Sequence, residues 1–113
     1  MNMGNSFLRI DDRAAFDNLL SDSKGKAVIV FKHSNACPIS ARAYREMEKL
    51  ADQVNLLEVQ VAPDLSRELA TLTGVRHESP QVILLRDGKA VWDASHFDVN
   101  AASVSQALQS NAQ

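Results

Sequence analysis

The chain has 113 residues and a formal net charge of −2, which suits one domain over residues 1–113 with a real core and is too short for two. Apolar residues make up 45% and charged residues 23%, ordinary usage for a globular protein that needs no metal or disulfide staple. The basic residues are dispersed, which argues against a nucleic-acid surface, and neither a signal peptide nor a membrane span is evident. We therefore expect a protein of the reducing cytoplasm that binds no nucleic acid and no membrane.

The N-terminal part of the chain predicts a short extended segment followed by a helix. Residues 7–10 are mostly apolar, and Asp11 or Asp12 can then cap a helix. Residues 21–25 are small, polar or glycine and end it. The apolar face of this helix consists of Ala15, Phe16, Leu19 and Leu20.

The next segment contains the strongest strand signal. Residues 27–32 form a continuous run rich in β-branched side chains, typical of a strand covered on both faces. A polar loop over residues 33–36 leads from it to Cys37, the only cysteine. Residues 38–51 then show helical spacing of Ile39, Ala43, Met47 and Leu50. The run over 27–32 is the best candidate for the central strand.

The middle of the chain predicts another strand and helix. Residues 55–61 alternate in part, with Leu57, Val59 and Val61 on one side. A turn at residues 63–64 then starts a short helix that ends at Gly74, the usual place for a left-handed cap.

The C-terminal part predicts a hairpin and a last helix. Strands over residues 81–85 and 90–92 flank a turn containing Asp-Gly, a strong hairpin signal. Asp98 or Asn100 can cap the final helix, which runs through Val104 and Leu108. Together these elements predict an α/β fold with a central four- to five-stranded mixed sheet flanked by helices, the thioredoxin-like arrangement.

Cys37 lies between the predicted central strand and the predicted helix that follows it. Unpaired N–H groups and the helix dipole at such a position stabilise a thiolate relative to the thiol. Pro38 suits the first helical position, which makes Cys37 the cap residue. A buried packing role is the alternative for a free cysteine, but the polar surroundings favour a reactive one.

Ser79 and Pro80 directly precede the third strand of this topology, close to the helix that carries Cys37. We expect a cis peptide bond before Pro80, which would turn the Ser79 backbone toward an extended disulfide substrate. The alternative is that Pro80 merely starts a strand near the sheet edge.

Three further polar residues are candidates for supporting roles. Ser40 replaces the second cysteine of Cys-x-x-Cys; its hydroxyl could hydrogen-bond the thiolate, or it is an ordinary first-turn serine. His33 and His77 could lie near the sulfur and assist its ionisation, or be loop histidines without a role. Cys37, His33 and His77 offer metal-ligand atoms but match no ligand spacing, so no metal site is predicted.

Two blocks of the sequence resemble the monothiol bacilliredoxins, small cytosolic thioredoxin-like proteins with a Cys-Pro-Ile-Ser centre. The first block is Phe31-Lys32-His33-Ser34, Cys37-Pro38-Ile39-Ser40 and Tyr44-Arg45-Glu46, and the second is Val75-Arg76-His77-Glu78-Ser79-Pro80-Gln81. The resemblance implies removal of bacillithiol from protein mixed disulfides, with Cys37 as the nucleophile and Ser79-Pro80 as the cis-proline platform. S-thiolated client proteins and bacillithiol, or another low-molecular-weight thiol, would be the partners, without a cofactor.

The chain departs from two better-known relatives. Thioredoxins place a buried acid six residues before the reactive cysteine, where this chain has Phe31. Cluster-binding monothiol glutaredoxins have Gly-Phe-Ser after the cysteine, where this chain has Pro38-Ile39-Ser40. Two other functions stay open: a redox sensor or adaptor that forms one intermolecular disulfide, and a metal or iron–sulfur carrier.

Overall fold

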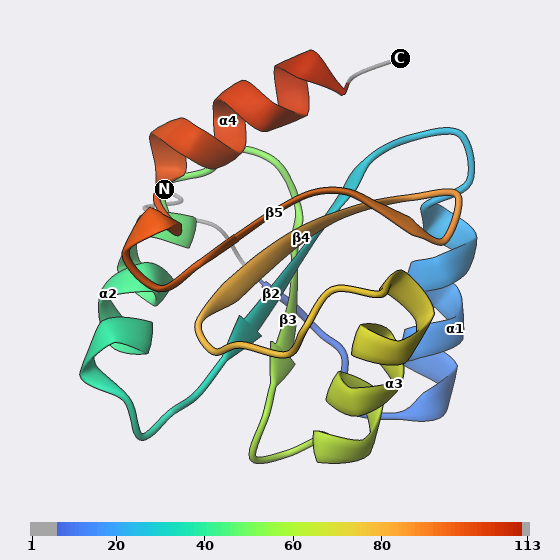
Figure 1. Ribbon diagram of the computed structural model, residues 1–113, viewed down its shortest axis with the longest axis horizontal. Coiled ribbons are helices and arrows are strands. Elements are labelled where there is room, and N and C mark those ends of the chain that lie inside the picture. The colour runs from blue at the N-terminus through green and yellow to red at the C-terminus, as the bar shows by residue number, and fades with distance from the viewer. Residues whose placement is uncertain (1–6, 112–113) are drawn as a thin grey trace.

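The strands lie in the order β1-β3-β2-β4-β5 in a computed structural model that describes residues 7–111 (Figure 1). β2 pairs in parallel with β3 and antiparallel with β4, so it is the central strand, as predicted. β1 pairs in parallel with β3, and β4 forms a hairpin with β5. The bounds are Leu8–Arg9 for β1, Val28–His33 for β2, Val54–Glu58 for β3, Gln81–Arg86 for β4 and Lys89–Ser95 for β5.

Two pairs of helices cover the two faces of this sheet (Figure 1). α1 (Arg13–Asp22) and α3 (Pro63–Thr73) cover one face, and α2 (Pro38–Met47) and α4 (Ala101–Ser110) cover the other. A short 3-10 helix, η1 (His96–Asp98), joins β5 to α4. The expected α/β arrangement, a mixed sheet of four to five strands flanked by helices, is observed with five strands. None of the helices within residues 7–111 combines the length and the apolar character needed to cross a membrane.

The side chains of β2 divide the core between these two faces. Ile29 and Phe31 pack in the cluster that contains α2 and α4 residues, and Val30 packs in the cluster that contains α1 and α3 residues. All three are at most 1% exposed. Alternation along a strand sends successive side chains to opposite faces, so a strand covered on both sides needs an uninterrupted apolar run.

Capping side chains and residues with positive φ determine where several helices and strands begin or end. The Oδ1 atoms of Asp12 and Asn100 accept hydrogen bonds from backbone N–H groups in the first turns of α1 and α4. Asp12 rather than Asp11, and Asn100 rather than Asp98, is therefore the capping residue. Gly74 ends α3 with a φ of 73°, the left-handed cap that its position predicted. Asp87 and Gly88 have φ values of 53° and 73°, the backbone that a tight hairpin turn requires.

Several predicted boundaries were wrong, and β5 runs to Ser95 rather than residue 92. α2 ends at Met47 rather than residue 51. The N–H groups of Lys49 and Leu50 donate to carbonyls three residues earlier, instead of four as in an α-helix. β3 ends at Glu58 rather than residue 61, because the N–H groups of residues 61 and 62 both bond back to the Glu58 carbonyl. β2 extends through His33, which the sequence assigned to the loop, because its carbonyl accepts a hydrogen bond from Val59.

Candidate active site

Cys37 is the N-cap residue of α2, as predicted. Its backbone is extended (φ −120°, ψ 123°), its carbonyl accepts the first helical hydrogen bond from Ala41 at 3.0 Å, and Pro38 occupies the start of the helix. The thiol is partly exposed and makes no capping hydrogen bond. The sulfur therefore stands at the positive end of the helix with access to solvent.

The loop between β2 and Cys37 is tied to the segment that follows β3. The Gln60 side chain accepts a hydrogen bond from the Asn35 N–H at 3.2 Å and donates one to Ser34 Oγ at 2.8 Å. Asn35 Nδ2 donates to Glu58 Oε2 at 2.8 Å. These three bonds fix the backbone immediately before the thiol. No local pattern in the sequence pointed to Gln60 or Glu58, since their partners lie more than 20 residues away.

Glu58 is itself held by Arg9, whose guanidinium donates to Glu58 Oε1 at 2.7 Å. This hydrogen bond lowers the pKa of Glu58 below its ordinary value. Glu58 thus stays ionised at neutral pH and continues to accept the bond from Asn35. Arg9 of β1 therefore helps to hold the loop before Cys37 indirectly, through the Glu58 carboxylate.

Ser40 is completely buried at the start of α2, and its hydroxyl has two partners. Ser34 N–H donates to Ser40 Oγ at 2.9 Å, and His33 Nδ1 lies 2.8 Å from the same oxygen. If Nδ1 is unprotonated, Ser40 donates its proton to the ring; if Nδ1 carries the proton, the ring donates and the Ser40 hydroxyl proton is free for another acceptor. Ser40 therefore connects the start of α2 to His33 at the end of β2 and to the loop residue Ser34.

The His33 ring is packed among aromatic side chains. Its centroid lies 4.9 Å from that of Tyr44 and 5.5 Å from that of Phe31, and the residue is 8% exposed. Burial lowers the pKa of His33 from its ordinary value of 6.5. The ring is consequently neutral at pH 7, which favours a proton-accepting imidazole over a cationic one.

The Ser79–Pro80 segment leads into β4 beside the end of β2. The peptide bond before Pro80 is cis, as the sequence predicted. Gln81, the next residue, pairs with Lys32 of β2. β4 lies between β2 and the edge strand β5, so Pro80 does start a strand next to the sheet edge. Neither the N–H nor the C=O of Ser79 has a hydrogen-bond partner within residues 7–111.

The two histidines considered with Cys37 lie in different surroundings. His33 contacts Ser40 of α2, whereas His77 contacts Ser66 of α3, with 3.1 Å between Nδ1 and Oγ. Burial and the charge of Lys32 both lower the pKa of His77. Within residues 7–111 no three His, Cys, Asp or Glu side chains are grouped so that they could hold a metal ion.

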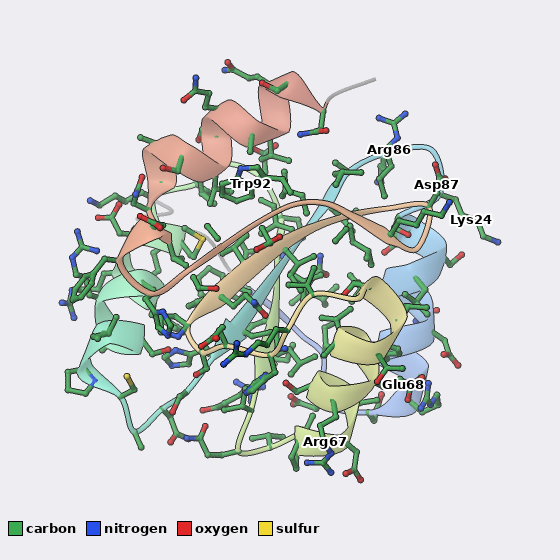
Figure 2. All side chains as sticks on the ribbon, in the orientation of Figure 1. Lys24, Arg67, Glu68, Arg86, Asp87 and Trp92 are labelled. Atoms are coloured by element: carbon green, nitrogen blue, oxygen red, sulfur yellow. The ribbon has the colours of Figure 1, made fainter. Side chains whose placement is uncertain are left out.

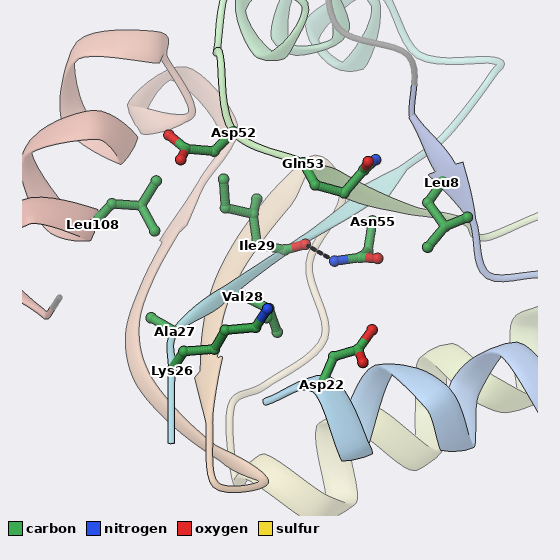
Figure 3. A pocket seen from close by; sticks show the side chains of 10 residues that line it. All are labelled: Leu8, Asp22, Lys26, Ala27, Val28, Ile29, Asp52, Gln53, Asn55 and Leu108. Atoms are coloured by element: carbon green, nitrogen blue, oxygen red, sulfur yellow. Dashed lines mark hydrogen bonds between the residues drawn. The ribbon is translucent and has the colours of Figure 1, made fainter. Parts of the chain in front are cut away.

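A separate pocket of about 270 Å³ lies away from the thiol (Figure 3). Its lining includes Val28 and Ile29 at the start of β2, while Cys37 follows the other end of that strand. Figure 3 shows Asn55 in its wall, where Nδ2 donates to the Ile29 carbonyl at 2.9 Å. This pocket is therefore not part of the Cys37 site.

Comparison with known proteins identifies a matching family and structures with the same fold. A family model described as monothiol bacilliredoxin BrxC matches residues 8–104. A solved structure of a candidate oxidoreductase with a thioredoxin fold is 36% identical, spans 89% of this chain and 92% of its own, and has a TM-score of 0.81. Thioredoxins from Trypanosoma brucei brucei and Malassezia sympodialis share the fold at lower identity.

For the Trypanosoma protein the identity is 17%, the coverage 97% of this chain and 95% of that one, and the TM-score 0.73. For the Malassezia protein the identity is 15%, the coverage 98% and 94%, and the TM-score 0.74. The fold and the family match both support a thiol redox function. With the family model covering residues 8–104, this chain belongs to the monothiol bacilliredoxin family.

Proposed function

We propose that this protein removes bacillithiol, or a similar low-molecular-weight thiol, from protein mixed disulfides through Cys37. The observation that carries the proposal is the position of the thiol, which caps α2 and is partly exposed at the end of the central strand. Family membership supports the same chemistry. The reaction uses a small thiol as co-substrate and no further cofactor, and the cytoplasm supplies such a thiol in reduced form.

The reaction takes two thiol–disulfide exchanges. The Cys37 thiolate attacks the small-thiol sulfur of the client mixed disulfide; the client leaves as a thiolate and a disulfide forms between Cys37 and the small thiol. A second small thiolate then attacks the small-thiol sulfur of that disulfide. This releases a symmetric small-thiol disulfide and returns Cys37 as a thiolate, so overall the client is reduced to its thiol and one free small thiol is oxidised.

Ser40 and His33 assist the thiolate without resolving the disulfide. In the tautomer with the proton on Nδ1, His33 donates to Ser40 Oγ at 2.8 Å. The Ser40 hydroxyl proton is then free to turn toward Cys37, three residues earlier at the same helix end. A serine cannot form a disulfide, so the second exchange requires an external thiol.

The backbone of Ser79 is the proposed platform for the client chain. The pairing of Gln81 with Lys32 supports this role, since it brings the preceding residues to the end of β2, where the thiol loop begins. The unpaired N–H and C=O of Ser79 can bond an extended segment as an added strand would. Pro80 and His77 flank this segment.

Intact-mass spectrometry tests the proposal directly. The reduced protein is mixed with a client carrying bacillithiol, and in parallel with the same client carrying glutathione. The expected result is transfer of the bacillithiol mass to Cys37 with release of free client thiol. A protein that takes up neither small thiol, or that forms a stable disulfide with the client itself, would contradict the enzyme and favour the sensor or adaptor.

A further inference from the structure

Lys32 is a buried cation that the reaction above does not use. It lies in β2 and is 0% exposed, and its Nζ atom makes one hydrogen bond, a long one of 3.5 Å to the Ser66 carbonyl. Within residues 7–111 no carboxylate forms an ion pair with it. Gln81 pairs with Lys32 across the sheet, and its Oε1 atom is buried without a partner among the described residues. Removing this ammonium group from water therefore lowers the free energy of unfolding.

A pocket of about 240 Å³ is connected to this cation through Ser66, and Lys32 itself does not line it. Ser66, whose carbonyl contacts Lys32, forms part of its wall, and so does His77, whose pKa the Lys32 charge lowers. The first turn of α3 adds the positive end of a helix. The lining residues are Val59, Pro63, Ser66, Arg67 and His77.

The acidic side chains near this pocket are already engaged by other groups. Arg67 lies near the start of α3 (Figure 2) and contacts the exposed carboxylate of Asp64. Glu78 is the other nearby acid, and its Oε1 atom lies 3.3 Å from His96 Nε2. Both carboxylates therefore already have partners, whereas the buried Lys32 charge has none in contact.

The pocket also borders the segments that surround the thiol. Val59 in its wall donates its N–H to the His33 carbonyl, and the next residue, Gln60, holds the loop before Cys37. His77 precedes the proposed platform at Ser79 by two residues. The pocket and the loop before Cys37 therefore lie at the same end of β2 and β3.

We propose that this pocket binds a carboxylate of the low-molecular-weight thiol and that Lys32 supplies the positive potential that attracts it. The inference rests on the proposed function and adds the substrate class: an anionic small thiol is preferred to an uncharged one. A carboxylate seated against Ser66, His77 and Arg67 gains charge-assisted hydrogen bonds. Lys32 acts through the wall of the pocket, so it is a specificity residue and touches no reacting atom.

The test compares two small thiols that differ only in this charge. One client protein is prepared with N-acetylcysteine and with N-acetylcysteine amide as mixed disulfides, and transfer to Cys37 is followed by intact mass. Each rate is divided by the rate of the same mixed disulfide with a free thiol in solution, which removes differences in intrinsic reactivity. Because the client is the same, a carboxylate of the client cannot produce a difference.

The wild-type protein should prefer the carboxylate form by about tenfold, the effect of roughly one charge-assisted hydrogen bond. Lys32→Met should bring the ratio close to one through slower transfer of the anionic thiol, with the neutral thiol transferred at the wild-type rate. Arg67→Gln, an exposed change that leaves the core intact, should lower the same ratio in part. Lys24→Met, at an exposed turn after α1, is the matched control and should keep it.

The inference is wrong if the wild-type protein transfers both thiols equally, or if Lys32→Met and Arg67→Gln both keep the preference. In either case transfer itself still supports the proposed function. If the wild-type protein transfers neither thiol, the proposed function fails and the inference with it. The two failures are therefore distinguishable in one set of measurements.

Discussion

Replacing Lys32 with methionine should stabilise the protein. The buried ammonium is 0% exposed and has one long hydrogen bond, so the folded state pays for removing it from water. Burial lowers the pKa of Lys32 from 10.5 to about 8. At 1.36 kcal/mol per pH unit this difference corresponds to about 3 kcal/mol. Methionine fills a similar volume without a charge, so most of that free energy should be recovered at pH 7.

The gain should depend on pH in a definite direction. Below pH 8 Lys32 is charged in both the folded and the unfolded state, and the full cost is present. Between pH 8 and 10.5 the unfolded chain binds more protons, so the wild-type protein becomes more stable relative to the variant. The advantage of Lys32→Met should fall from about 3 kcal/mol at pH 7 to about 1.5 kcal/mol at pH 9.5.

Urea unfolding, followed by the fluorescence of Trp92 and by circular dichroism, measures this difference. Trp92 is the only tryptophan and packs against the core cluster that includes α4, so its emission reports the tertiary structure. Lys24→Met serves as the control, because its side chain is exposed and should change stability little at either pH. A Lys32→Met variant no more stable than wild type at pH 7, or an advantage that does not shrink at pH 9.5, would refute the argument.

Three further predictions concern the thiol site. Cys37→Ser should abolish transfer of the small thiol in the mass assay while leaving the fold unchanged by circular dichroism. Ser40→Ala should slow formation of the capped protein by only about twofold to tenfold, and should lower the free energy of unfolding by about 1–3 kcal/mol because it leaves Ser34 N–H and His33 Nδ1 unpaired. Gln60→Ala removes two hydrogen bonds to the thiol loop and should reduce the transfer rate up to about tenfold without changing the thiol preference; Gln60→Glu, which keeps the acceptor for Asn35 N–H, should lose less.

Most of the fold could be predicted from short stretches of sequence. The run before Cys37 predicted the central strand, Gly74 the end of α3 and Asp87-Gly88 the hairpin, since each depends on conformational preferences of a few neighbouring residues. The position of Cys37 at the start of α2 followed from the same local signals. The predicted ends of α2 and β3 came too late in the chain. The apolar pattern continues past both elements, into turns that are still buried or near the sheet.

The supporting residues of the site depended on contacts that the order of residues does not display. The sequence offered Ser40 either as a partner of the thiolate or as an ordinary first-turn serine, and its contact with His33 needs the end of β2 to lie against the start of α2. Gln60 meets its partners in the loop before Cys37 only because β3 lies parallel to β2. Local preferences say where a turn occurs but not which distant side chain it meets.

Lys32 is the clearest case of the division between sequence and tertiary structure. A lysine at the end of an apolar run that both faces of the sheet should cover was already an anomaly in the sequence, and it was counted there simply as part of the strand. Strand alternation and the packing of α3 decided that its ammonium is buried against Ser66. The sequence by itself thus determined the thiol, its helix and the succession of strands and helices along the chain, because these follow from local preferences. The tertiary structure alone decided which polar groups are buried and what they face, because burial depends on the elements that pack together.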